Sequence, residues 1–159
     1  MQLTLYTDYS LRVLVYLSIN QESTATISQI ADFYQISRNH LVKVVHNLSL
    51  KKYIISSRGK GGGLRLARLP ELINIGDVVR DTEPNFHVVE CFNAEALNTC
   101  SVEPICKLKG ILGKATNHFL GTLDSYSIAD ILDNDLDESR IIALDPQLQK
   151  ILMQPEESG

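Results

Sequence analysis

Three cysteines are the residues of this chain most able to do chemistry. Cys91, Cys100 and Cys106 lie within 16 residues, and the other 143 residues contain none. Thiols that merely fill a core would be scattered, whereas three thiolates converging on one point are typical ligands of a soft metal or an iron–sulfur centre. The intervening gaps of eight and five residues match neither the short cysteine pair of a zinc site nor ferredoxin spacing. The spacing therefore favours a metal site over three free thiols without identifying the metal.

A site with four ligands needs a donor besides the three cysteines. Several acids and one histidine lie nearby in sequence, namely Asp81, Glu83, His87, Glu90 and Glu103. Asp8 is far away in sequence, and an acid is in any case favourable in the first turn of a helix. The residues alone leave the fourth ligand open.

A second pattern, ahead of the cysteines, is typical of a DNA-binding surface. Helical spacing predicts helices over 8–19, with Thr7 as its cap, over 26–34, and over 37–50 with Ser37 as N-cap. In the third helix the apolar stripe lies opposite a polar, basic face, which is the helix-turn-helix arrangement. Two β-prone runs flanking a glycine-rich turn within 53–67 predict a hairpin that serves as a wing. Its glycines are expected to supply positive φ and close approach to DNA.

Eight residues are predicted to contact DNA. The start of the third helix can reach base edges, and the basic side chains further along and on the wing can contact phosphates. These residues are Ser37, Arg38, Asn39 and His40 for the helix start, and Lys43, Arg58, Lys60 and Arg65 for the phosphates.

The distribution of charge supports this assignment although the net charge is −4. Nine Lys and Arg against three Asp and Glu give residues 1–69 a formal charge of +6, while residues 70–159 carry −10. A basic half of this size is typical of a surface that binds a polyanion. No run approaches the roughly 18 apolar residues of a membrane span, and no signal peptide is evident at the N-terminus. A cytoplasmic protein with no membrane partner is expected.

We expect a mainly α fold with a small β wing: a winged helix-turn-helix followed by a cysteine loop and a long dimerisation helix. The predicted regions are 1–69 for DNA binding, 70–103 for a linker helix over 75–80 and the cluster loop, 104–133 for dimerisation helices, and 134–159 for an acidic, partly mobile tail. The long helix is expected to start at Pro104, because apolar residues then recur every three or four positions. A shorter helix is expected over 127–132.

Five segments carry a resemblance to a known family. They are Leu3–Tyr9, Ile36–Lys43, Arg58–Leu66, Ile75–Arg80, and the three cysteines followed by Lys107 and Leu108. Over about residues 1–133 the chain resembles the bacterial iron–sulfur winged-helix repressors of the IscR/NsrR type. The Ser-Arg-Asn-His run at 37–40 is most similar to the branch that senses nitric oxide, the NsrR type.

The resemblance implies a homodimeric, non-enzymatic repressor that binds an inverted-repeat operator in double-stranded DNA. It implies an iron–sulfur cluster, 2Fe-2S or 4Fe-4S, held by Cys91, Cys100, Cys106 and Asp8 of the partner subunit, with nitric oxide as the signal. The histidine ligand of the IscR-like branch would lie three residues after the third cysteine, where this chain has Lys109. The alternatives are a regulator of the same architecture that senses iron–sulfur or redox status, a structural zinc protein, and an iron–sulfur enzyme.

Overall fold

In the computed structural model, the described residues are 2–19, 21, 23–59, 61–94 and 100–131. Within these ranges the chain forms five α-helices and one two-stranded sheet, which confirms the predicted mainly α fold with a small β wing. The elements are α1 (Leu5–Ile19), α2 (Ile27–Tyr34), α3 (Arg38–Leu50), β1 (Ile54–Ser56), β2 (Leu64–Leu66), α4 (Ile75–Thr82) and α5 (Lys107–Leu123). The predicted tail, 134–159, lies outside the described residues.

The first helix begins one turn earlier than the sequence predicted, so the assignment of Thr7 as its cap is wrong. Thr4 takes that role: its hydroxyl accepts a hydrogen bond from the Thr7 N–H at 3.3 Å, and Thr7 itself is buried. The carboxylate of Glu83 accepts hydrogen bonds from the Thr4 N–H (2.7 Å) and hydroxyl (3.1 Å). These bonds satisfy a donor that would otherwise be left unpaired at a helix start. The partner lies 79 positions away, so no local pattern could have indicated it.

The second and third helices form the predicted helix-turn-helix. Thr26 caps α2 in a capping box with Gln29, and Gln35 turns the chain in the left-handed conformation at φ 54°. The four apolar residues of the predicted stripe on α3 are all buried: Leu41, Val44, Val45 and Leu48. Ser37 stands at the N-cap position of α3, but its side chain makes no capping hydrogen bond. The predicted role of its hydroxyl as a cap is therefore wrong.

The predicted hairpin is present, with β1 and β2 antiparallel and Ile54 opposite Leu66. A backbone bridge between Ala25 and Leu64 ties the hairpin to the segment before α2. Burial of Tyr53, Ile54 and Leu64 joins the base of the wing to the core formed with α1, α2 and α3.

The same core continues past residue 69. Ile73 and Val78, together with Ile128 from the segment after α5, are fully buried in it. The backbone bonds Ile75 N–H to Tyr126 C=O and Ile128 N–H to Ile73 C=O, both 2.9 Å, hold the segment after α5 against the start of α4. The helix expected over 127–132 is a short 3₁₀ turn at Ala129–Ile131, and residue 132 lies outside the described ranges.

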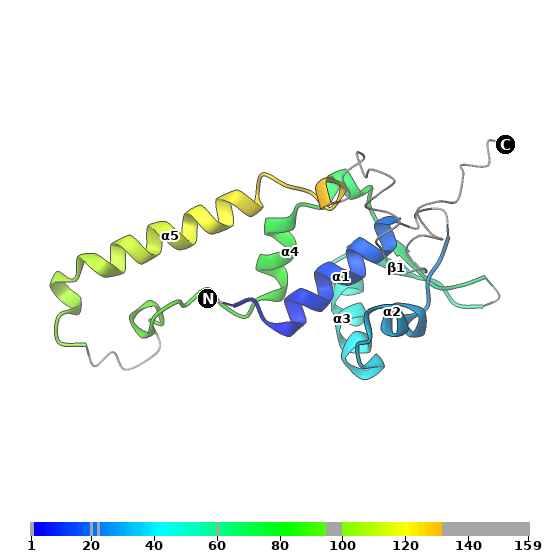
Figure 1. Cartoon of the computed structure of the whole chain (residues 1–159), viewed down its shortest axis with the longest axis horizontal. Coiled ribbons are helices and arrows are strands. Elements are labelled where there is room, and N and C mark those ends of the chain that lie inside the picture. The colour runs from blue at the N-terminus through cyan, green and yellow to red at the C-terminus, as the bar shows by residue number, and fades with distance from the viewer. Residues whose placement is uncertain (1, 20, 22, 60, 95–99, 132–159) are drawn as a thin grey trace, which may run out of the picture.

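Figure 1 shows α5 as an arm attached to the head, which is the part of the chain formed by α1 to α4 and the hairpin. The C-terminal end of α5 lies beside α4, and its N-terminal end lies far from α1, α2 and α3. The helix begins at Lys107, not at Pro104 as the sequence predicted. Pro104 lies in a 3₁₀ turn, Glu103–Ile105, and Cys106 then takes an extended conformation at φ −77° and ψ 107°. That conformation interrupts the helical hydrogen-bonding path and makes Cys106 the N-cap residue of α5. No helix within the described ranges is both long and apolar enough to cross a bilayer.

Candidate DNA interface and thiolate site

The recognition-helix residues predicted from the sequence share one exposed surface. Ser37, Arg38, Asn39 and His40 form the exposed start of α3, and the side chain of Lys43 is exposed one turn later. The buried stripe of α3 fixes the helix against the head and turns this start toward solvent. A helix N-terminus carrying arginine, asparagine and histidine is suited to insertion into a major groove.

The wing presents further positive charge. Arg58 and Arg65 are both exposed on the hairpin, whereas Lys60 lies outside the described residues. Gly59 at φ 101° and Gly61 at φ 83° confirm that the turn needs positive φ. A Cβ at Gly62 would lie 2.5 Å from the Ser57 carbonyl oxygen, and one at Gly63 would lie 2.8 Å from the Thr24 Cβ. The crowding at these two glycines therefore comes from the hairpin's own neighbours.

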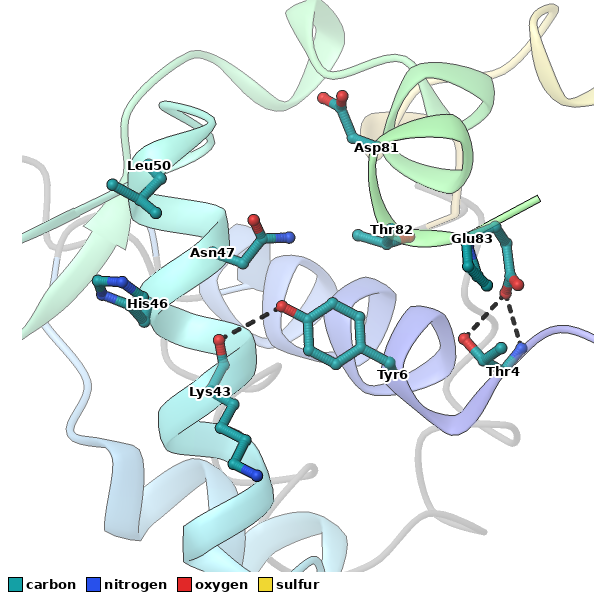
Figure 2. A pocket seen from close by; sticks show the side chains of 10 residues that line it. Thr4, Tyr6, Lys43, His46, Asn47, Leu50, Asp81, Thr82 and Glu83 are labelled. Carbon is teal, nitrogen blue, oxygen red and sulfur yellow. Dashed lines mark hydrogen bonds between the residues drawn. The ribbon is translucent and has the colours of Figure 1, made fainter.

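An open groove of about 580 Å³ runs beside α3, between the start of α1 and the end of α4 (Figure 2). Tyr6 reaches into it, and its hydroxyl donates to the Lys43 carbonyl oxygen at 3.4 Å. Burial raises the pKa of Tyr6, against a smaller lowering by Asn47. The phenol therefore stays neutral and can act as a donor. Tyr6 links the start of α1 to the middle of the recognition helix, a role that sequence reasoning missed.

The surroundings of Asp8 contain the other residues that sequence reasoning missed. The Asp8 carboxylate is bound by Arg12 through two contacts, each 3.0 Å. The Arg12 guanidinium lies 5.6 Å from the ring centroid of Tyr34 in α2. Tyr9, next to Asp8, stacks on His40 of α3 with ring centroids 6.3 Å apart. The turn of α1 that carries Asp8 therefore contacts both helices of the helix-turn-helix. The i, i+4 spacing of Asp8 and Arg12 was the only available local signal.

The three cysteines occupy irregular structure between α4 and α5. Cys91 is half-buried in a 3₁₀ turn at Glu90–Phe92, Cys100 is exposed, and Cys106 is half-buried at the N-cap of α5. The ring of Phe92 lies 4.0 Å from where a Cβ on Gly113 would be, so the first cysteine turn rests against α5.

Lys109 lies three residues after Cys106, in the first turn of α5. Its ammonium group forms an ion pair with Glu103 at 2.5 Å. The pKa of Lys109 is raised chiefly by the hydrogen bond to Glu103, with smaller contributions from the Glu103 charge, Cys91 and Cys106. Two of the three thiols therefore act on one lysine, and the position where the IscR-like branch has a ligand is filled by a cation.

The donor set suits a soft metal, because three sulfur atoms on one segment match the preference of iron–sulfur and similar centres. Among the described residues, no three His, Cys, Asp or Glu side chains lie together closely enough to hold a metal ion. Asp8 lies on α1 in the head, and residues 95–99 between the first two cysteines are outside the described ranges. Within the described residues of one chain, the predicted ligands therefore do not lie together.

Comparisons with known proteins identify the family to which most of the chain is similar. The model of the Rrf2 family, described as an iron-dependent transcriptional regulator, matches residues 3–134. An NsrR transcriptional regulator from Bacillus licheniformis is 51% identical over 135 residues, which cover 84% of this chain and 94% of that protein. The Bacillus subtilis NsrR is 46% identical over 145 residues, covering 91% and 99% of the two chains.

Solved structures show the same fold at lower identity. CymR, the global cysteine regulator of Bacillus subtilis, has a TM-score of 0.67 and 22% identity, covering 82% of this chain and 95% of that one. The IscR of T. potens has a TM-score of 0.66 and 23% identity, covering 88% and 91%. With relatives named as transcriptional regulators over most of its length, the chain is a DNA-binding regulator of the NsrR type, is not an enzyme, and belongs to the Rrf2 family.

Proposed function

We propose that this regulator is a homodimeric repressor whose iron–sulfur cluster couples nitric oxide to release of an inverted-repeat operator. Cys91, Cys100 and Cys106 of one chain, with Asp8 of the partner subunit, would hold the cluster. Arg38, Asn39 and His40 would contact base edges, with Ser37 beside them at the helix start. Lys43, Arg58, Lys60 and Arg65 would contact phosphates.

The surroundings of Asp8 are the observation that carries the proposal. If Asp8 binds the cluster, the cluster is attached to a turn of α1 that contacts both helices of the helix-turn-helix. That turn contacts α2 through Arg12 and Tyr34, and α3 through Tyr9 and His40. Arg12 binds the same carboxylate, so ligation of Asp8 would compete with this ion pair. Ligation at Asp8 can therefore alter the recognition helix without touching DNA.

The exposed apolar face of α5 supports the homodimer. Leu108 and Ile111 on α5 are 57% and 61% exposed, and Ile105 in the 3₁₀ turn before the helix is 82% exposed. Thr116 is the only buried residue of α5 within the described chain. An apolar helix face of this kind requires a partner to bury it. A second copy of α5 would supply that partner and would place two recognition helices on one operator.

When bound, the cluster supplies iron that reacts with nitric oxide. The chain's own residues contribute thiolate ligands, the carboxylate that restrains the head, and the contacts that carry the restraint to α3. Moving operator occupancy from nearly full to nearly absent requires about 5 kcal/mol between the two states. A few misplaced groove contacts at about 1–3 kcal/mol each can supply that difference.

Anaerobic gel shifts with a nitric oxide donor test the signal. Operator complexes formed by the cluster-containing protein should be lost when fresh donor is added, and should persist when a fully decomposed donor solution is added. The alternative, a sensor of iron–sulfur or redox status, predicts another outcome: the cluster is visibly nitrosylated while operator affinity is unchanged, and iron removal alone releases the DNA.

Mixed dimers test the assignment of Asp8 to the partner subunit. Subunits carrying Asp8→Ala are combined with subunits carrying Cys106→Ala and the dimers are reconstituted anaerobically. If the ligands come from both chains, one of the two sites keeps all four and should match a wild-type site in absorbance and stability. If all four ligands come from one chain, no intact site can form, and the mixed dimer should show only the altered cluster of the Asp8→Ala homodimer.

A further inference from the structure

The junction between the end of α5 and the head contains a charged pair that the proposed function does not use. The Arg80 guanidinium binds both oxygens of the Asp124 carboxylate, with nitrogen–oxygen distances of 2.5 and 2.8 Å. Asp124 is the C-cap residue of α5, and Arg80 lies in the last turn of α4. The pKa of Asp124 is lowered, chiefly by its hydrogen bonds from Arg80, so the pair is ionised at neutral pH.

Gly76 makes room for this pair. It is buried in the first turn of α4, and a Cβ there would overlap the Asp124 carboxylate and lie 2.8 Å from a guanidinium nitrogen of Arg80. Any side chain at this position must displace the carboxylate. The Ile75–Arg80 segment therefore has a physical role: Gly76 leaves space for the Asp124 carboxylate, and Arg80 binds it.

Further bonds hold the same corner. The Asn74 side-chain amide donates to the backbone carbonyl of Asp124 at 2.7 Å, and Asn74 also caps α4 by accepting from the Asp77 N–H. Beyond the corner, the buried Ile128 anchors the chain in the core of the head. The end of α5 is therefore held by Arg80, which binds the Asp124 carboxylate, and by Asn74, which binds the Asp124 carbonyl.

The length of α5 amplifies any change at this corner. Its 17 residues span about 26 Å, so a rotation of about 10° at the base moves the far end by about 4.5 Å. Successive base pairs are about 3.4 Å apart along a DNA strand. A change of about 10° in the angle between α5 and the head is therefore large enough to shift one DNA-binding head by about one base pair relative to the head of the partner subunit.

We propose that Gly76, Arg80 and Asp124 set the angle between α5 and the DNA-binding head, and thereby select the half-site spacing of the operator. This inference rests on the proposed homodimer. The three residues act as positioning residues, because they fix where each recognition helix lies without touching the bases.

In vitro selection from a random duplex library tests the inference, because it needs no known operator. Anaerobically purified, cluster-containing wild-type protein should select an inverted repeat at one spacing, favoured over spacings one base pair longer or shorter by about tenfold or more. Gly76→Ala and Asp124→Asn should select the same half-site sequence with the preference reduced to about threefold or less. Asp77→Asn is the matched control, since it removes an exposed carboxylate next to Gly76 and should keep the wild-type spacing preference.

Each outcome decides between the two proposals. If wild-type protein selects isolated half-sites without a second one at fixed distance, the homodimer proposal fails and this inference fails with it. If wild-type protein selects one spacing and both variants keep it, only the inference fails. Should Gly76→Ala reduce folding, Asp124→Asn alone decides, because it keeps the side-chain shape and removes the charge and one of the two oxygens that accept from Arg80. Gly76→Ala combined with Asp124→Ala should match Asp124→Ala alone, since glycine acts by making room for the Arg80–Asp124 pair, which the second change already breaks.

Discussion

Asp81 shows how a single residue fastens α4 to the wing. Its carboxylate accepts hydrogen bonds from the Lys51 ammonium (2.7 Å) and from the hydroxyl of the buried Tyr53 (2.8 Å). Burial alone would raise the pKa of Asp81, but the hydrogen bonds from Lys51 and Tyr53, together with the charges of Lys51 and Arg68, lower it below its ordinary value. The carboxylate therefore stabilises the fold above its ordinary pKa, and the stabilisation is lost as pH falls through the lowered value.

We expect the free energy of unfolding to fall at acidic pH more steeply in wild type than in Asp81→Asn. Tyr53→Phe removes one donor and should cost about 1 kcal/mol at neutral pH. Denaturant melts at several pH values measure both effects. Identical pH profiles for wild type and Asp81→Asn would show that the carboxylate contributes no pH-dependent stability.

The cysteines should matter to the cofactor and not to folding. None of the three is fully buried, so Cys91→Ala, Cys100→Ala and Cys106→Ala should each abolish the visible chromophore while leaving the helical circular dichroism unchanged. Ser101→Ala, an exposed neighbour of Cys100, is the control and should keep the chromophore. Absorbance with iron and sulfide analysis of anaerobically purified protein measures the result. Colourless wild-type protein containing stoichiometric zinc would contradict the iron–sulfur assignment.

At the scale of elements, the segment after α5 is held in the head by one buried side chain. Ile128 is 0% exposed in the shared core, whereas Ile131 in the next turn is 43% exposed. Ile128→Ala should therefore lower the free energy of unfolding by about 2–4 kcal/mol, and Ile131→Ala by less than about 0.5 kcal/mol. Chemical denaturation of the two variants compares them directly. Equal losses would mean that this segment does not belong to the cooperative core.

At the scale of the whole molecule, the split of charge should govern DNA binding. Contact with about six phosphates per head, or about twelve for the dimer, would give a log–log salt slope of about −11. Arg58→Ala should weaken binding to all sequences, whereas Arg38→Ala should also relax discrimination at one base pair by about 1–3 kcal/mol. Lys114→Ala, an exposed lysine on α5, is the control. Titrations at two salt concentrations measure the slope, and equal affinity at both would exclude the phosphate contacts.

Several elements could be located from local signals in the sequence. The Thr26 capping box, the apolar stripe of α3 and the positive-φ glycines of the wing each involve residues only a few positions apart. Local geometry decides such features before any packing occurs, so pattern reasoning located α2, α3 and the hairpin correctly. The exposed faces of the same elements then held the predicted DNA-contacting residues that the structure describes.

Features that depend on residues distant in the chain became apparent only in the folded structure. Glu83 accepts a hydrogen bond from Thr4 at the start of α1, and Asp124 meets Gly76 and Arg80 from the C-terminal end of α5. Tyr9 and His40 stack because α1 crosses α3, and neither residue carries a local signal of that contact. The gathering of Asp8 with the three cysteines stays a prediction for the same reason, since a ligand set shared between chains is fixed by assembly. Contacts of this kind form only when packing brings separated segments together, and no pattern of period two or 3.6 encodes them.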